Sequence, residues 1–494
     1  MMSKVYRDLR EWLEAIESHG ELKRITGADW DLEMSSLTEI VYREGKEPKP
    51  ALLFDDIPGY TRGYRTLFGL LGSLRRIAMA LGLPDDQTNR VSLLQNWKRM
   101  NKGISLIPPK FVTSGPVLAN SLTGDKIDLL KFPIPRFHEQ DGGRYIGTGH
   151  AVIQKDPDTD WVNLGIYRVM LVDKDRLALH ILEGKHGRVI MDEKYFGRGQ
   201  VMPVAVAIGM DPTLWFASLH RVPWGVSEYD YSGGIKGTPI EVIKGPYTGL
   251  PLPAHAEIVI EGECHPGELV DEGPFGEWHG YYGNLGLETV PEPVIRVKAI
   301  HYRNDPILTC AHTTAPYSDT SLFHAVANSA GLWDHLEAAG VPGVKDVWNP
   351  EAGNGALLFI VSIKQMYAGH ARQAGLTASQ YRAASVGRYT VLVDDDIDPS
   401  NLDEVIWAIL TRSDPKQAIQ ILERCHSSSA DTTISPEEKR RYKVPPKPLT
   451  TSNAIIDACR PYEWKAEWYP LARVSSGLRT RIFEKWDAVL KEIL

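Results

Sequence analysis

Cysteine is scarce in this sequence, and the four cysteines that occur are far apart. They are Cys264, Cys310, Cys425 and Cys459. No Cys-x-x-Cys pair exists, so the chain lacks the spacing of a thiolate metal site and that of a disulfide framework. We therefore expect a reducing, cytoplasmic setting.

Long apolar runs and an excess of basic residues are also absent. Apolar stretches such as residues 204–208 are too short to span a bilayer, and residues 1–4 lead into a helical pattern without an apolar signal core. Lys and Arg number 55 against 63 Asp and Glu, and the net charge of −8 is spread along the chain. These features argue against a membrane or a nucleic-acid partner.

Several catalytic signatures are missing as well. The chain has no G-x-x-x-x-G-K-[ST], no G-x-S-x-G, no H-E-x-x-H, and no G-x-G-x-x-G after a strand. Phosphoryl transfer by a P-loop, serine hydrolysis and zincin chemistry are therefore disfavoured. With 43% hydrophobic and 24% charged residues, the 494-residue chain is typical of a globular protein of two to four domains.

The pattern predicts an N-terminal α/β domain over residues 1–115. A strand is expected at 51–54 and a helix at 73–81, and the turn residues 108–109 and 115–116 mark the boundary. One apolar stripe predicts an opening helix, formed by Val5, Leu9, Trp12, Leu13 and Ile16. Gly20 is expected to end that helix.

Residues 116–305 change to short β-branched runs separated by Gly and Pro turns. This pattern of short runs and turns predicts a β-rich domain, either a barrel or a sandwich. The expected strands include 150–154, 169–172, 204–208, 240–243 and 256–260.

Helices return in residues 306–475, which predict a second α/β domain. Strands are expected at 356–361 and 390–393, with Ser400 or Asp398 capping a helix over 402–407. Residues 426–450 are expected to form an exposed excursion, which ends in Pro445-Pro446-Lys447-Pro448. Its run Lys439-Arg440-Arg441 is interpreted as a solvated face.

The last segment, residues 476–494, predicts a helix with one strongly apolar stripe. The stripe consists of Leu478, Ile482, Phe483, Trp486, Val489, Leu490 and Ile493. Such a face must dock on its own chain or on a neighbouring subunit.

The densest polar segment is Asp271 to Gly280, which carries Glu272 and Glu277 around a Gly-Pro turn beside aromatic residues. A carboxyl group against aromatic walls should have a raised pKa, which suits proton donation near neutral pH. The alternative is a pair of exposed loop carboxylates.

Two further segments carry possible ligands. On one strand, Asn163 and Arg168 would fall on opposite faces unless a bulge intervenes, and the Arg168 fork suits a carboxylate. Asn163, His186 and Glu228 together offer an amide oxygen, an imidazole nitrogen and a carboxylate oxygen. That mixture suits Mn²⁺ or Mg²⁺.

An ordered set of motifs spans nearly the whole chain. It comprises Asp8-Leu9-Arg10 followed by Gly20-Glu21-Leu22, then 137–145, 163–168, 223–228, 272–277, 393–398 and 455–458. In this set the chain resembles the UbiD family of decarboxylases that depend on prenylated FMN. The resemblance implies an N-terminal α/β domain, a central split β-barrel that binds the flavin, and a C-terminal α/β domain used in forming a homodimer or hexamer.

The resemblance also implies roles for residues. Asn163, His186 and Glu228 match the family's ligands for a divalent metal, usually Mn²⁺, often with K⁺ nearby. Glu277, Arg168 and Glu272 match its catalytic network, with Glu277 as the proton donor after CO₂ loss. The flavin is expected to contact Asn163, Ile166, Tyr167, Arg168, Lys185, His186, Glu228 and Arg388. Arg388 stands where relatives often have a lysine that faces the phosphate.

The sequence departs from that family in two places. Residues 311–317 replace a Gly-x-Pro-Pro segment, and Arg188 follows closely on His186. We interpret Arg188 as part of a surface salt bridge and His312 as a loop histidine with satisfied hydrogen bonds.

The sequence therefore predicts a non-oxidative decarboxylase of an aromatic or heteroaromatic acid, supplied with prenylated FMN by a flavin prenyltransferase. Hydroxybenzoates, polycyclic acids such as phenazine-1-carboxylate, and aroyl-CoA thioesters stay open as substrates. The alternatives are a conventional FMN-dependent reductase on a split barrel, a glycosidase that uses Glu272 and Glu277, and a cofactor-binding scaffold.

Overall fold

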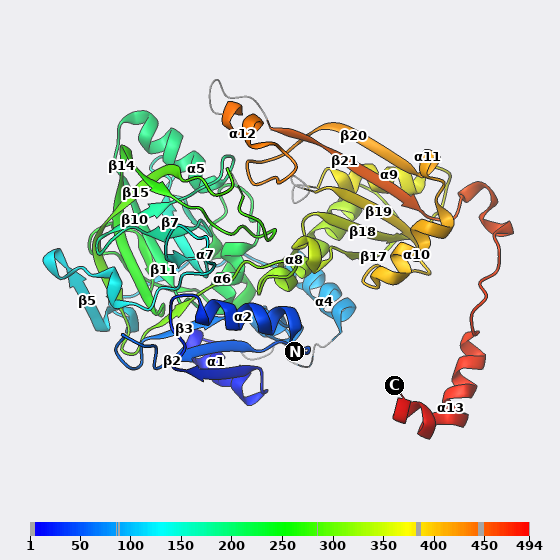
Figure 1. Cartoon of the computed structure of the whole chain (residues 1–494), viewed down its shortest axis with the longest axis horizontal. Coiled ribbons are helices and arrows are strands. Elements are labelled where there is room, and N and C mark those ends of the chain that lie inside the picture. The colour runs from blue at the N-terminus through cyan, green and yellow to red at the C-terminus, as the bar shows by residue number, and fades with distance from the viewer. Residues whose placement is uncertain are drawn as a thin grey trace.

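The structure is a computed structural model that describes residues 5–84, 86, 89–283, 285–381, 387–442 and 449–493. Residues 443–448, which include the predicted Pro-rich end of the excursion, lie outside the described residues. Figure 1 shows a β-rich body and a C-terminal α/β body on either side of helix α8 (Ser321–Ala338), with the N-terminal layer beneath them.

The N-terminal layer is a small mixed sheet covered by helices. Its strands run in the order β1 (Leu22–Thr26), β2 (Ala51–Asp55), β3 (Arg65–Phe68) and β16 (Ile307–Thr309). The helices are α1 (Leu9–Ser18), α2 (Glu33–Glu44), α3 (Leu74–Ala80) and α4 (Arg90–Lys102).

The predicted opening helix is confirmed as α1. The Asp8 carboxylate caps it by accepting a hydrogen bond from Glu11 N at 3.0 Å. Its apolar stripe is buried at Leu9, Trp12, Leu13 and Ile16. Gly20, at φ 73°, turns the chain into β1, because a left-handed backbone favours glycine there.

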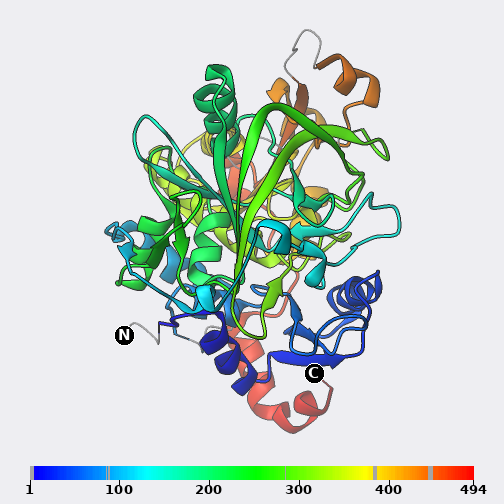
Figure 2. The same cartoon turned by 90° about the vertical axis from the view of Figure 1, so that its left-hand side faces the viewer.

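The central part is an antiparallel sheet that curls into a half-barrel, which confirms the expected split barrel. The strand order is β6 (Tyr145–Gly147), β9 (Val169–Leu171), β10 (Arg176–Leu179), β15 (Val290–Tyr302), β14 (Ile258–Glu272), β11 (Met202–Ile208), β7 (His150–Lys155) and β8 (Val162–Gly165), with β5 (Asn120–Thr123) paired to β15. The long β14–β15 hairpin runs through the half-barrel (Figure 2).

Smaller elements complete the central part. A second sheet has the order β13 (Pro251–Pro253), β12 (Glu241–Lys244) and β4 (Lys110–Phe111). The helices are α5 (His186–Val189), α6 (Pro212–Leu219) and α7 (Glu228–Lys236).

The C-terminal part is a mixed sheet with helices on both faces, as expected for an α/β fold. Its order is β17 (Val344–Trp348), β18 (Leu358–Ile363), β19 (Tyr389–Asp394), β21 (Thr450–Ala458) and β20 (Ile419–His426), and β18, β19 and β21 are parallel. Helices α8 and α9 (His370–Ser379) pack on one face, while α10 (Leu402–Arg412) packs on the other. The remaining helices are α11 (Pro415–Ala418), α12 (Pro436–Tyr442) and α13 (Ser476–Ile493).

The predicted cap of α10 is wrong, by one residue for Ser400 and by three for Asp398. Asn401, rather than Ser400 or Asp398, is the cap, and its side chain accepts a hydrogen bond from Glu404 N at 3.3 Å. Asp398 instead accepts from Ser400 N and Oγ, at 2.8 and 2.7 Å. The acidic side chain therefore stabilises the preceding turn.

Helix α13 extends away from the rest of the chain (Figure 1). Its apolar side chains Leu478, Ile482, Phe483 and Trp486 are 39–48% exposed. The predicted docking face is therefore not covered by the described part of its own chain. Among the described helices, none is both long enough and apolar enough to cross a membrane.

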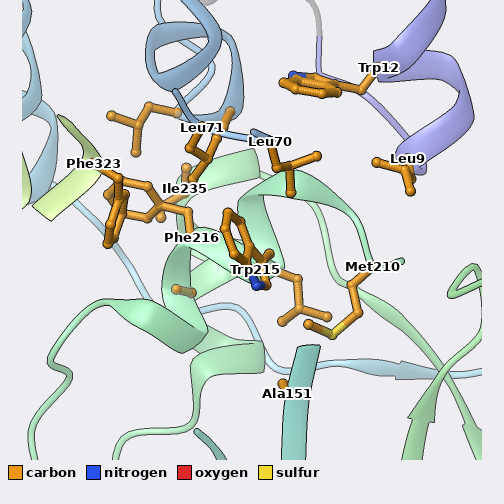
Figure 3. Packing of buried hydrophobic residues seen from close by; sticks show 14 of the residues in the cluster. Leu9, Trp12, Leu70, Leu71, Ala151, Met210, Trp215, Phe216, Ile235 and Phe323 are labelled. Atoms are coloured by element: carbon orange, nitrogen blue, oxygen red, sulfur yellow. The ribbon is translucent and has the colours of Figure 1, made fainter. Parts of the chain in front are cut away.

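One core joins the three parts of the chain. The Phe216 ring in α6 meets Trp97 in α4 edge-on at 5.2 Å and Phe323 in α8 at 5.0 Å between ring centroids. Figure 3 shows Phe216 and Phe323 side by side, and Leu9 and Trp12 belong to the same cluster. Burial of these rings holds the central sheet to both flanking layers.

We expect Phe216→Ala to lower the free energy of unfolding by about 3–5 kcal/mol, because it leaves a cavity where three helices meet. Differential scanning calorimetry would record this as a lower transition temperature. The control is Leu410→Ala, since Leu410 is 76% exposed. Equal melting of both variants would contradict the role given to Phe216.

Candidate active site

The two carboxylates that the sequence singled out are both buried. Glu272, the last residue of β14, is 0% exposed, and Glu277 in the following loop is 8% exposed. The alternative of two exposed loop carboxylates is therefore wrong. Buried carboxylates need a cation or hydrogen-bond donors close by.

Arg168 supplies that cation to both carboxylates. Its Nε and Nη2 donate to the two oxygens of Glu272, each at 2.7 Å, and its Nη1 donates to Glu277 Oε1. The guanidinium carbon also lies 4.9 Å from the centroid of the Phe275 ring. One planar fork therefore binds one carboxylate with two bonds and the other with a single bond.

The expectation that Asn163 and Arg168 lie on opposite faces of one strand is wrong. Strand β8 ends at Gly165 and β9 begins at Val169, so Arg168 lies in the connection between them. The alternation of side chains therefore does not extend to Arg168.

The neighbouring Arg168 favours the ionised form of Glu272. Burial alone would raise the pKa of Glu272, but the charge and hydrogen bonds of Arg168 and the Tyr145 hydroxyl outweigh burial and lower it. The raised pKa expected beside aromatic walls is therefore wrong for Glu272. The same two carboxylates raise the pKa of Arg168 despite its burial.

Residues 141–145 hold the carboxylate loop in place. Asp141 Oδ1 accepts from Gly276 N at 3.1 Å, and Gly142 N donates to Pro274 O at 2.8 Å. A β-carbon on Gly142 would overlap the Gly273 carbonyl, so the approach requires glycine. Tyr145 Oη donates to Glu272 Oε1 at 3.0 Å. The sequence motif 137–145 contains Tyr145, but no local signal could link it to Glu272, 127 residues away.

A second polar group surrounds the end of β8. Glu228, the first residue of α7, accepts from Leu164 N at 2.7 Å, next to Asn163. Tyr167 Oη accepts from Asn163 Nδ2 at 3.3 Å and from Gly187 N at 3.0 Å, next to His186. The structure thus links the segments that carry the three predicted metal ligands, through Leu164, Tyr167 and Gly187.

Aromatic rings enclose His186, the first residue of α5. Its ring lies 5.4 Å from Trp161 and 5.2 Å from Trp224 between centroids. Lys185 precedes it as the cap residue of α5, and Ile166 packs against the main core. Burial raises the pKa of the Glu228 carboxyl to about 8, with no ion pair described for that side chain.

A cavity of about 500 Å³ lies beyond His180, and Arg168, Glu272 and Glu277 are not among its lining residues. His180 lines it, and its backbone N donates to Arg168 O at 3.0 Å. Arg188 also lines it and pairs with Asp192 at 2.5 Å, which confirms the predicted salt bridge. The cavity wall therefore carries charges of both signs, since Glu183, Asp192 and Glu292 also line it.

The C-terminal part contributes Lys439 and Arg440 to the same cavity. Lys439 is only 8% exposed, and burial lowers the pKa of its ammonium, while the charges of Asp431 and Glu277 oppose that change. The interpretation of Lys439 as part of a solvated face is therefore wrong. A run of charged residues in the sequence does not reveal which of its side chains is buried by contacts with distant residues.

Two further residues lie elsewhere. The Arg388 guanidinium binds Asp431 at 2.7 Å and the hydroxyls of Thr433 and Thr451. His312 is buried, and neither ring nitrogen has a hydrogen-bond partner among the described residues. The prediction of a satisfied loop histidine is therefore wrong.

Three family models match the chain. They are the N-terminal, Rift-related and C-terminal domains of 3-octaprenyl-4-hydroxybenzoate carboxy-lyase, which match residues 13–92, 110–316 and 321–458. The chain is 33% identical over 432 residues to a pyrrole-2-carboxylic acid decarboxylase from Pseudomonas aeruginosa, and the match covers 84% of each chain.

Solved structures agree over almost the whole length. The UbiD-class enzyme HmfF from Pelotomaculum thermopropionicum, in complex with FMN, has a TM-score of 0.82 and 29% identity, covering 96% of this chain and 98% of that one. The closed form of vanillic acid decarboxylase from Sedimentibacter hydroxybenzoicus has a TM-score of 0.82 and 28% identity, covering 99% of each. Together with the family models, these matches show that the chain belongs to the UbiD family of prenylated-FMN-dependent carboxy-lyases.

Proposed function

We propose that this chain removes CO₂ reversibly from an aromatic or heteroaromatic carboxylic acid, with prenylated FMN bound beside Arg168. The observation that carries the proposal is the buried arrangement in which Arg168 joins Glu272 and Glu277. Loss of CO₂ from an aromatic ring leaves a costly carbanion. When bound, prenylated FMN supplies the electron sink for that charge.

The side chains divide the remaining work. Glu272, ionised and bound through both oxygens, keeps Arg168 oriented. Arg168 is placed to orient the substrate carboxylate or Glu277, and Glu277 returns the proton that replaces CO₂. Burial of all three excludes water, which strengthens each of these interactions.

We also propose that Asn163, His186 and Glu228 hold a divalent metal, Mn²⁺ or Mg²⁺, at the flavin phosphate, with K⁺ nearby. Glu228 is 3% exposed and has no described cation partner, so a bound metal would compensate a buried carboxylate. Tyr167 Oη links the Asn163 and His186 segments, and Ile166 and Lys185 are further candidates for flavin contact. Arg388 would have to release Asp431 to reach a phosphate.

The substrate is proposed to enter through the cavity that Arg188, Lys439 and Arg440 line. Arg188 and Arg440 are already paired with Asp192 and Glu288, so Lys439 is the cation of this lining that is placed to meet an anionic ligand. The relatives named above are decarboxylases of pyrrole-2-carboxylic acid and vanillic acid. Monocyclic aromatic acids should therefore be assayed before polycyclic acids and aroyl-CoA thioesters.

We expect Glu277→Gln to lower kcat for decarboxylation by about 10²–10⁴-fold, because the amide cannot return a proton. Protein co-expressed with a flavin prenyltransferase would be assayed for CO₂ release and hydrogen exchange on the product. The control is Glu241→Gln, at a carboxylate 38% exposed on β12. Full activity of Glu277→Gln would contradict the assigned role.

Asn163→Ala and His186→Ala should each lose metal and prenylated FMN together, because both ligands are proposed to hold the same ion. Elemental analysis, mass spectrometry and visible absorption on one sample would measure both losses. His265→Ala is the control, since this histidine pairs with Glu263 on the β14 strand. Full occupancy in both variants would refute the metal site, and wild-type protein with plain FMN and no metal would favour the reductase.

We further propose that α13 docks on a second copy of the chain, in a homodimer or a hexamer, because its apolar face is exposed on its own chain. Ile482→Asp combined with Phe483→Asp should lower the mass measured by light scattering after gel filtration. Glu484→Ala, on the same exposed helix, should leave it unchanged. An unchanged mass in the double variant would argue against this interface.

A further inference from the structure

His312 is a buried imidazole whose polar atoms have no described partner. It is 1% exposed, and neither ring nitrogen makes a hydrogen bond of good geometry within the described part of the chain, although the Ser35 main chain lies close to the ring. Its ring stacks on Phe137 at 5.5 Å between centroids, with Phe68 edge-on at 6.2 Å. Burying two unpaired ring nitrogens is costly, so we expect a bound ligand to pair with at least one of them.

Two other ligand-bearing side chains meet His312. One ligand atom each from Glu39, His138 and His312 lies within 4.8 Å of the others. They come from three separate segments: α2, the stretch before β6, and the loop after β16. Their spacing would let all three atoms bind a single ion.

The surroundings of Glu39 and His138 resemble an outer shell that orients metal ligands. His138 Nδ1 lies 3.5 Å from Asp141 Oδ2, so a carboxylate stands behind one ring nitrogen. Metal-bound histidines commonly direct their second nitrogen at a carboxylate in this way. Arg43 Nη1 donates to Glu39 Oε1 at 2.7 Å in a surface pair, and this bond occupies only one of the two carboxylate oxygens.

We propose that Glu39, His138 and His312 form a second metal site, which takes a borderline divalent cation such as Zn²⁺. Two imidazole nitrogens and one carboxylate oxygen, with solvent as the fourth ligand, suit tetrahedral Zn²⁺. This site is separate from the Asn163, His186 and Glu228 group, which is associated with β8, α5 and α7.

The site would act as a clamp behind the catalytic loop. Asp141 Oδ1 accepts from Gly276 N at 3.1 Å, and Thr313 Oγ1 donates to Gly276 O at 2.5 Å. Both segments that carry the histidines therefore contact the residue before Glu277. The ion would tie them to α2, which makes Glu39, His138 and His312 positioning residues.

The test counts the zinc that the full-length protein binds. Chelator-treated protein is incubated with Zn²⁺, gel-filtered and analysed for metal, and its melting temperature is recorded with and without Zn²⁺. We expect Glu39→Gln and His138→Gln to bind one equivalent less than wild type and to lose the rise in melting temperature that Zn²⁺ gives. Glu44→Gln, at an exposed residue on the same helix, should match wild type.

Glu39→Gln keeps the test decisive if the histidine variants fail to fold, because Glu39 is only partly buried on the surface of α2. Equal zinc content in wild type and Glu39→Gln, with equal melting, would overturn the proposal. The count does not depend on the decarboxylation assay. Failure of the proposed function would therefore leave this result unchanged.

Discussion

The candidate site depends on one guanidinium placed between two buried carboxylates. Arg168 binds Glu272 through both oxygens and Glu277 through one. In a site so poorly solvated, each charge relies on the others, because removing one partner of a buried ion pair typically costs about 3–5 kcal/mol. The fold must therefore bring the β8–β9 connection and the end of β14 together with little freedom.

The half-barrel meets this requirement through contacts between distant segments. Pairing of β14 with β15 fixes where Glu272 leaves the sheet, since Glu272 is registered opposite Val290. Asp141, Gly142 and Tyr145 then hold the following loop by main-chain and hydroxyl bonds. Lys439 lines the cavity beyond His180 from the C-terminal part, so two parts of the chain form that cavity.

Local patterns were enough to predict much of this architecture, including α1, β11 and the α/β character of both ends. Two of the errors share one physical origin, which is contact between residues far apart in sequence. Aromatic neighbours suggested a raised pKa for Glu272, but a guanidinium 104 residues away reverses the direction. A charge run suggested a solvated Lys439, and a break at Gly165 removed the expected strand alternation. The assignment of Asn163, His186 and Glu228 as metal ligands came from the family resemblance, because their spacing in the sequence could not show that they meet.

The unequal bonding of the two carboxylates separates their roles. Glu272 uses both oxygens on Arg168 and also accepts from Tyr145, so protonating it would break several charge-assisted bonds at once. Glu277 accepts a single bond from Arg168, and its Oε2 has no hydrogen bond among the described residues. In the proposed reaction, proton transfer at Glu277 Oε2 would therefore leave the Arg168–Glu272 pair intact. The same cation thus holds Glu272 as a fixed partner through two bonds and Glu277 through only one.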